Sequence, residues 1–268
     1  MAPPRYAELR AKSCFSFLRG ASHPEELVGC AAELGIAALA LTDVNGLYGV
    51  VRAHAEAKRR GLALVTGVEL TCRELSPGPF PTAPLVLLAQ DREGYAGLCR
   101  LVSQAHCGIA EGLATPVRRL VRQVGQERVI DLPFSQVAER PRGLFALYPG
   151  ADAEAASRLR EAFGRRLALA VERHHVAGEE TRIAAARSVG RRLGIAVAIT
   201  NDAHTHARAR QPLQDVLTCI RLGITVEKVG RRLFPNAERT LKGAEEMAQL
   251  WPDFPEGLEN AVDVAEAC

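Results

Sequence analysis

The chain has 268 residues, a formal net charge of +3, and a composition that is 47% hydrophobic and 24% charged. These values are typical of a globular protein and allow one large α/β barrel or two small domains. No apolar run reaches the ~18 residues of a membrane-spanning helix, and the first residues lack the apolar core of a signal peptide. The seven cysteines are odd in number and form no Cys-x-x-Cys pair, so we expect reduced thiols in a cytoplasmic protein without membrane contact.

Apolar runs and stretches with helical apolar spacing alternate along most of the chain. Strands are expected at 6–11, 38–42, 62–66, 84–89, 143–148, 167–172 and 195–199. Helices are expected between them at 24–34, 47–60, 92–105, 153–163 and 179–193. Seven strands that alternate with helices predict parallel β/α units wound in a right-handed sense.

Local signals mark where some of these helices begin. A capping box is predicted at Ser22–Glu25, with Ser22 as the N-cap of the first helix, and Asp91 predicts the cap of the third. The pattern is weaker between residues 106 and 142, where one helix is expected near 116–124.

Beyond residue 210 the expected strands cease, and helical stretches remain at 213–222, 241–251 and 257–267. We therefore predict a barrel domain at 5–210 and a helical extension at 211–268. The extension has more apolar residues than a chain terminus needs, which predicts that part of it is a docking face for other domains or a second copy. These residues are Val216, Leu217, Ile220, Met247, Leu250, Trp251, Val262 and Val264.

Ionisable side chains stand at or near the ends of the expected strands. They are Arg10, Lys12, Asp43, Glu69, His174, His175, Asp202, His204 and His206. The carboxyl ends of barrel strands meet at one mouth, where ligands bind and chemistry takes place. Clustered carboxylates and imidazoles suit Zn²⁺, Mn²⁺ or Fe²⁺, and such a cluster fits a metal-assisted phosphoester hydrolase.

The stretch Thr200–His206 is the strongest of these signals because it follows an apolar strand directly. Alternate residues of an extended segment point to the same side, so Asp202, His204 and His206 can converge. The alternative is a polar loop with two surface histidines.

Arginine dominates the basic residues, since only four of the 34 are lysines. Arginine clusters near 118–122, 158–166, 187–192, 208–210 and 231–232 could contact phosphates, as a DNA-binding module would. Solvated helix faces with acidic neighbours are the alternative for each cluster.

Several blocks of sequence recur in an order that identifies a family. They are Tyr6–Ser13, Phe15–Ser22, Ala40–Asp43, Gly94-Tyr95 with Leu98-Cys99, Pro212–Leu217 and Phe234–Arg239. Along nearly the whole chain they resemble the bacterial error-prone DNA polymerases of the C family. The resemblance implies the polymerase and histidinol phosphatase (PHP) domain, a distorted seven-stranded TIM-like β/α barrel that precedes the polymerase palm. Nucleotidyl transfer in this family uses palm carboxylates beyond Cys268, so the resemblance also implies the remaining polymerase domains as partners, with DNA bound through the whole polymerase.

The resemblance further implies a set of metal-ligand positions, about half of which are substituted here. Active members end the first strand in His-x-His, where this chain has Arg10 and Lys12, and a third ligand is usually found at the position of Val44. A histidine often found before the fourth strand is replaced by residues near Pro84. Matches remain at Glu69, His174, Asp202 and His204, with Asp43 as a neighbour.

Charged Arg and Lys side chains have no lone pair to offer a metal. Each unit of like charge 4 Å from another costs about 4 kcal/mol at an effective dielectric near 20. We therefore predict a degenerate site with no divalent metal, or with Zn²⁺, Mn²⁺ or Mg²⁺ bound weakly at a partial site. Buried Glu69 or Asp202 should then lie within salt-bridge range of Arg10 or Lys12.

The predicted function is a structural platform for an error-prone polymerase in translesion synthesis, DNA replication and repair. The alternatives are a free-standing metal-dependent phosphoesterase or a 3′–5′ exonuclease that uses the surviving ligands, and a DNA-binding module that uses the arginine clusters.

Overall fold

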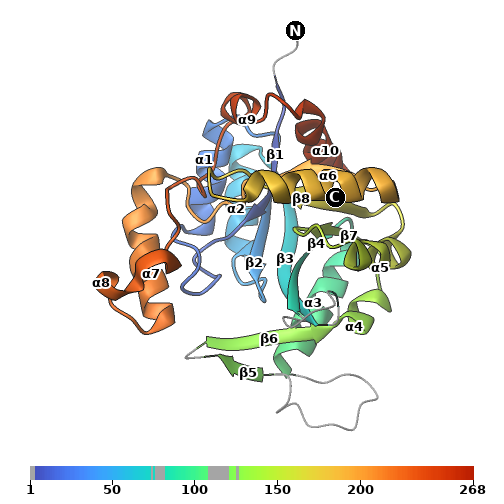
Figure 1. Cartoon of the computed structure of the whole chain (residues 1–268), viewed down its shortest axis with the longest axis horizontal. Coiled ribbons are helices and arrows are strands. Elements are labelled where there is room, and N and C mark those ends of the chain that lie inside the picture. The colour runs from blue at the N-terminus through green and yellow to red at the C-terminus, as the bar shows by residue number, and fades with distance from the viewer. Residues whose placement is uncertain (1–3, 74, 76–81, 108–120, 125–126) are drawn as a thin grey trace.

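The computed structural model describes residues 4–73, 75, 82–107, 121–124 and 127–268. A curved sheet with the strand order β1-β2-β3-β4-β7-β8-β9 forms its centre (Figure 1). The strands are β1 (Ala7–Ala11), β2 (Ala38–Val44), β3 (Ala63–Arg73), β4 (Thr82–Ala89), β7 (Leu144–Tyr148), β8 (Leu167–Val171) and β9 (Ala196–Ile199). The predicted seven-stranded, distorted α/β barrel is thereby confirmed.

The first and last strands of the sheet meet at their carboxyl ends. The Lys12 main-chain N–H donates to the Ala203 carbonyl at 2.8 Å, and the Ala203 N–H donates to the Arg10 carbonyl at 2.8 Å. Helix α10 (Pro255–Glu266) packs against both β9 and β1, and Asn260 Nδ2 donates to the Val197 carbonyl at 3.0 Å. The carboxyl ends of β1 and β9 therefore surround one mouth together with those of β2, β3, β7 and β8.

The prediction that all seven strands are parallel is wrong for β4. This strand is antiparallel to both of its neighbours, β3 and β7, whereas the β1–β3 and β7–β9 pairs are parallel. The connection from Arg73 to Thr82 is shorter than the dozen or more residues that a parallel crossover needs, so the chain turns back directly.

Helices pack on the outside of the sheet. They are α1 (Pro24–Glu33), α2 (Val50–Arg60), α3 (Arg92–Cys107), α5 (Ala153–Phe163) and α6 (Glu179–Leu193). The predicted Asp91 cap is confirmed, since its Oδ1 accepts the Gly94 N–H at 2.8 Å. The capping box of α1 lies one residue later than predicted, because His23 is the N-cap and Glu26 Oε2 accepts the His23 N–H at 2.8 Å. Ser22 bonds His206 instead.

A small hairpin was not predicted from the sequence. β5 (Val121–Val124) pairs antiparallel with β6 (Glu127–Pro133), β6 continues alongside the end of β3, and α4 (Phe134–Ala138) follows. The helix expected near 116–124 is therefore wrong for residues 121–124, while residues 116–120 lie outside the described part. Pairing with a distant strand overrides the local pattern here.

The C-terminal part adds α7 (Gln211–Leu222), α8 (Val226–Val229), α9 (Ala244–Leu250) and α10. Figure 1 shows α7 and α8 at the left edge, away from the sheet, whereas α9 and α10 lie at the top near the start of β1. Trp251, Leu258 and Val262 belong to the same hydrophobic core as the barrel strands. The boundary placed at residue 210 stays a prediction.

Two further predictions concern membrane-spanning segments and the state of the cysteines. No helix among the described residues combines the length and apolar character needed to span a bilayer. Six cysteines are free thiols, namely Cys14, Cys30, Cys72, Cys99, Cys219 and Cys268, and the side chain of Cys107 lies outside the description.

Candidate functional site at the barrel mouth

Arg10 and Lys12 lie at the mouth of the barrel, where they contact the buried Asp202 and the half-buried Glu69 and Glu172 carboxylates. Arg10 Nη1 donates to Glu172 Oε2 at 2.7 Å, and its Nη2 donates to Glu69 Oε2 at 3.0 Å. Arg10 Nη2 also lies 3.3 Å from Asp202 Oδ1. Lys12 Nζ lies 3.0 Å from Glu69 Oε2 and forms an ion pair with Asp202 Oδ1. The ion pairs predicted for these two cations are therefore present.

A third cation completes the group, and sequence reasoning missed its role. Arg239 Nη1 donates to Asp202 Oδ2, and its Nη2 lies 3.8 Å from Glu172 Oε1. The only available signal was its position at the end of a block that resembles the polymerase family. Glu172, at the end of β8, was also missed. We call the six side chains of Arg10, Lys12, Arg239, Glu69, Glu172 and Asp202 the ion-pair cluster, in which three positive and three negative charges balance.

The cations keep the buried carboxylates of the cluster ionised. Burial by itself would raise the pKa of Asp202, but Arg10, Lys12 and Arg239 outweigh it and hold that pKa well below its ordinary value. Burial likewise opposes ionisation of Glu69, and the pKa of this group is nevertheless lowered by Lys12 and Arg10. The cluster is therefore a set of compensated charges rather than a set of free ligands.

Glu8 lies beneath the cluster because alternate residues of β1 point to the same side. Its carboxyl group accepts the Tyr6 hydroxyl and the Arg10 N–H, each at 2.8 Å, and the Asn201 N–H at 3.0 Å. These donors tie β1 to the loop after β9. Burial raises the pKa of Glu8 to about 7 despite the three donors.

The two surviving histidines are buried and bonded to the main chain. His174 Nε2 donates to the Asn201 carbonyl at 2.8 Å, and burial together with Arg239 lowers the pKa of His174 to about 4. His204 Nδ1 donates to the Arg19 carbonyl at 2.9 Å, and its Nε2 lies 3.5 Å from Asp202 Oδ2. Burial also lowers the pKa of His204.

Asp202 and His204 converge as predicted, but His206 does not join them. Its Nδ1 lies 2.8 Å from Ser22 Oγ, and its main-chain N–H donates to the same hydroxyl at 2.9 Å. The loop bends after Asp202, whose φ of 46° is left-handed, so the alternation of an extended segment is lost.

Asp43 anchors the loop that follows β1 instead of facing the cluster. Its Oδ1 accepts the Ser13 N–H at 2.7 Å and the Ser16 hydroxyl at 2.6 Å, and its Oδ2 accepts the Ser13 hydroxyl at 2.7 Å. Burial raises its pKa although these donors oppose the shift. Val44, the substituted ligand position, pairs with Glu69 in the register of β2 and β3.

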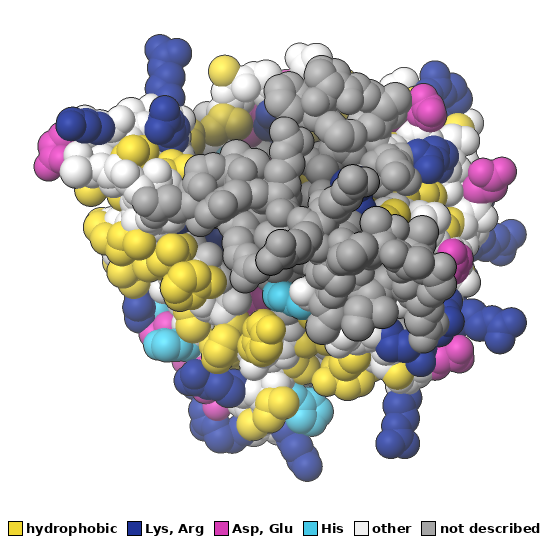
Figure 2. Space-filling model, turned by 90° about the horizontal axis from the view of Figure 1, so that it is seen from below, with side chains coloured by type: hydrophobic (Ala, Val, Ile, Leu, Met, Phe, Trp, Pro, Cys, Tyr) yellow, Lys and Arg dark blue, Asp and Glu magenta, His cyan; other side chains and the backbone are white. Residues whose placement is uncertain are grey.

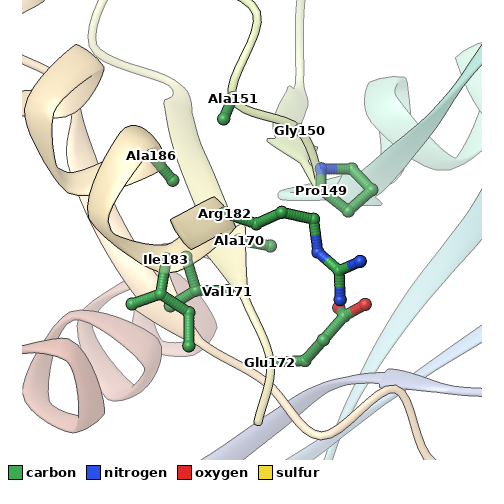
Figure 3. Close-up of a pocket in the computed structure, with 9 residues that line it drawn as sticks. All are labelled: Pro149, Gly150, Ala151, Ala170, Val171, Glu172, Arg182, Ile183 and Ala186. Atoms are coloured by element: carbon green, nitrogen blue, oxygen red, sulfur yellow. The ribbon is translucent and has the colours of Figure 1, made fainter. Parts of the chain in front are cut away.

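A small cavity of about 80 Å³ lies beside the cluster, between the ends of β7 and β8 and helix α6. Figure 3 shows the Arg182 side chain crossing from α6 toward the Glu172 carboxyl group, with Pro149 and Gly150 on the other side. The rest of its lining is apolar, from Ala151, Ala170, Val171, Ile183 and Ala186. Arg182 and Glu172 are therefore the charged side chains of an otherwise apolar lining.

The residues at the mouth do not fit a divalent metal ion. Two expected ligand positions hold the cations Arg10 and Lys12, and the Glu69 and Asp202 carboxylates that remain are paired with those cations. A divalent ion would also add two positive charges to a cluster whose charges already balance.

Comparisons with known proteins agree with this architecture. The PHP domain family profile matches residues 8–174. An error-prone DNA polymerase of Anaeromyxobacter sp. (strain K) is 69% identical over 266 residues, which cover 99% of this chain and 23% of that protein. An error-prone DNA polymerase of Methylococcus capsulatus is 41% identical over 263 residues, covering 98% of this chain and 23% of that protein. The chain thus spans about a quarter of the length of these curated relatives.

Among solved structures, one from Bifidobacterium adolescentis described as a metal-dependent phosphoesterase aligns with a TM-score of 0.52 and 16% identity. The alignment covers 75% of this chain and 89% of that one. At this identity the likeness shows the fold alone, and it agrees with the curled sheet and its surrounding helices. The profile match extends over more than half of the chain, and the chain therefore belongs to the PHP domain family.

Proposed function

We propose that this chain is the structural platform of an error-prone DNA polymerase that acts in translesion synthesis, replication and repair in the cytoplasm. The similarity to such polymerases over 99% of the chain supports the assignment, and the 23% share of their length implies further polymerase domains. The observation that carries the platform role is the ion-pair cluster. Its cations pair with the carboxylates that a metal-dependent hydrolase would use as ligands, so Glu69 and Asp202 are not free to hold a catalytic metal ion.

The outer face of α7 supports contact with the other polymerase domains. Leu213, Val216 and Ile220 are exposed by 42%, 45% and 56%, and their spacing places them along one stripe of the helix. The buried residues of the same helix include the polar Gln214 and Thr218. α7 therefore turns its apolar stripe outward, the reverse of an ordinary surface helix.

Figure 2 shows a gathering of hydrophobic side chains on the left of the molecule, the side on which Figure 1 places α7 and α8. On the same face, outside the grey atoms, basic side chains spread around the rim with acidic ones between them. This distribution favours protein contact at α7, with DNA held by the whole polymerase.

A metal titration tests the platform proposal. The purified chain should show no rise in Tm with Mn²⁺ or Zn²⁺ and no loss with EDTA, because a ligand stabilises a protein only by binding the native state. Two or more bound ions per chain, together with hydrolysis of a phosphodiester, would instead establish the phosphoesterase or exonuclease alternative.

The docking role of α7 is tested in the polymerase that contains this domain. Val216→Asp should lower the Tm of the whole polymerase and its primer extension while leaving the Tm of the isolated chain nearly unchanged, because the residue is already exposed. Val51→Asp is the matched control, since Val51 is exposed by 75% on helix α2. Equal losses in both variants would refute a docking role for α7.

A further inference from the structure

Residues 233–242, which we call the strap, lie across the ends of β8 and β9. Asn201 Nδ2 donates to the Glu238 carbonyl at 2.7 Å and to the Thr240 carbonyl at 2.6 Å. Asn236 Nδ2 donates to the His174 carbonyl at 2.6 Å. The His204 N–H donates to the Arg239 carbonyl at 2.8 Å. These bonds fix the main chain of the strap on both sides of Arg239.

A buried lysine adds a further tie at the end of the strap. Lys242 is only 1% exposed, and its Nζ lies 3.1 Å from Asn201 Oδ1 and 3.2 Å from Glu238 Oε2. These contacts hold the strap in addition to the pairing of Arg239 with Asp202, and none of them involves Arg10 or Lys12.

Two strap side chains enter the mouth of the barrel. The Arg239 guanidinium pairs with Asp202 and lies 4.7 Å from the centroid of the Phe234 ring. The Phe234 and His204 rings pack in a T-shaped arrangement, with the two centroids 5.1 Å apart. Phe234 therefore lies against both Arg239 and His204, two groups that contact Asp202.

The two oxygens of Asp202 are engaged by different cations. Oδ1 faces Arg10 of β1 and Lys12 directly after that strand, which we call the β1 cations, and Oδ2 faces Arg239 from the strap. Replacing the β1 cations with imidazoles would free only Oδ1. A divalent ion bound there would still face the charge of Arg239 across a single carboxylate, in a buried site where screening is weak.

We propose that Arg239 is a resident counterion of Asp202 that excludes divalent metals from this mouth, independently of Arg10 and Lys12. The inference rests on the proposed metal-free platform and adds a determinant outside the family's ligand positions. Substitution of the two β1 cations is then insufficient to create a metal site, and the strap cation must be removed as well.

The test compares Mn²⁺ affinity among variants of the full 268-residue chain by isothermal titration calorimetry. The parent variant carries Arg10→His and Lys12→His. Adding Arg239→Gln to it should tighten Mn²⁺ binding at least about tenfold, because a like charge next to the ion is removed. Adding Arg239→Lys, which keeps the charge, should leave the affinity of the parent within about threefold.

Arg208→Gln in the same parent is the matched control. Arg208 makes its ion pairs with Glu246 and Glu238 outside the cluster, so this change alters the net charge equally but at a distance. An equal gain from Arg208→Gln, or no gain from Arg239→Gln, would overturn the proposal. Tight Mn²⁺ binding by the unmodified chain would instead refute the metal-free platform. The proposed function and the role of Arg239 are therefore refuted by different results.

If circular dichroism shows that the three-residue variant does not fold, single substitutions decide the question. Arg239→Gln alone gives the cluster a net charge of −1, and its Mn²⁺ affinity should exceed that of Arg208→Gln by about threefold or more. Equal affinities of these two folded variants would count against a role for Arg239.

Discussion

At the scale of single residues, Lys12 shows how a cation at an expected metal-ligand position is accommodated in the barrel mouth. It lies between Glu69 and Asp202 and is only 3% exposed. A buried charge that loses its partner is strongly unfavourable, whereas the same pair on the surface contributes little. The stability of the mouth should therefore depend on each member of the ion-pair cluster.

Lys12→Met should lower the free energy of unfolding by about 3–5 kcal/mol, since it leaves buried carboxylates undercompensated. Urea denaturation at neutral pH measures the change. Arg5→Met, which removes an exposed pair with Glu266, is the control and should cost at most about 1 kcal/mol. Equal losses in the two variants would contradict the importance of burial.

The effect of Lys12→Met should also depend on pH. The pKa of Asp202 is depressed in the folded protein, so its stabilisation is present above the unfolded pKa of about 3.9 and is lost as pH falls through the folded pKa. The difference in the free energy of unfolding between Lys12→Met and the unmodified chain should therefore shrink in strong acid. A difference that stays constant down to the acid transition would show that the charge of Asp202 is not involved.

The pKa of Glu8 shifts in the opposite direction from that of Asp202, because burial raises it from the ordinary value of 4.5 to about 7 in the folded protein. Its stabilising contribution is complete below the unfolded pKa and is lost as pH rises through the folded value, a change on the order of 3 kcal/mol. Glu8→Gln should remove this decline between pH 5 and 8. The free energy of unfolding of Glu8→Gln must be compared with that of the unmodified chain at each pH. His174, whose pKa is lowered to about 4, destabilises the fold toward acid over an overlapping pH range in both proteins.

At the scale of elements, arginine–aromatic stacks join helix α6 and the end of β8 to the C-terminal helices. The Arg173 guanidinium lies 4.1 Å from the centroid of the Trp251 ring, and its Nη1 donates to the Leu250 carbonyl at 2.7 Å. Arg173 also pairs with Glu180 and Asp253. It therefore links the end of β8 and the start of α6 to the distant segment between α9 and α10.

Arg173→Met should destabilise the chain by about 2 kcal/mol, since a cation–π contact and several charged hydrogen bonds are lost together. Trp251 is the only tryptophan of the chain, so its fluorescence reports this junction in a denaturation experiment. Arg187→Met, which removes the more exposed stack on Phe254, should cost less than about 1 kcal/mol. A larger loss for Arg187 than for Arg173 would contradict the assignment of Arg173 as the main link.

At the scale of the whole molecule, one hydrophobic core extends from the sheet into the extension. Trp251 is completely buried, and Leu258 and Val262 are 4% exposed against the strands. α10 covers both β9 and β1, the two strands that begin and end the curved sheet. α9 and α10 therefore share the core of the barrel, whereas α7 and α8 lie away from the sheet.

A chain that ends at residue 210 should consequently lose the cooperative unfolding transition of the full chain. Its β1 and β9 strands would expose apolar surface that α10 buries, and apolar burial is the main stabilising contribution to folding. Circular dichroism during a thermal melt measures the transition. A sharp melt of residues 5–210 at a similar Tm would show that the predicted boundary separates two independent domains.

The amino-acid sequence by itself determined the positions of most strands and helices, because apolar periodicity is a local property. It also determined that Arg10 and Lys12 would meet Glu69 and Asp202, since parallel strands bring their carboxyl ends to one mouth. Only the tertiary structure decided that β4 runs antiparallel, that Asp43 anchors a loop, and that Arg239 joins the cluster from 37 residues beyond Asp202. These features depend on contacts between segments distant in the chain, and short-range patterns carry no signal for such contacts.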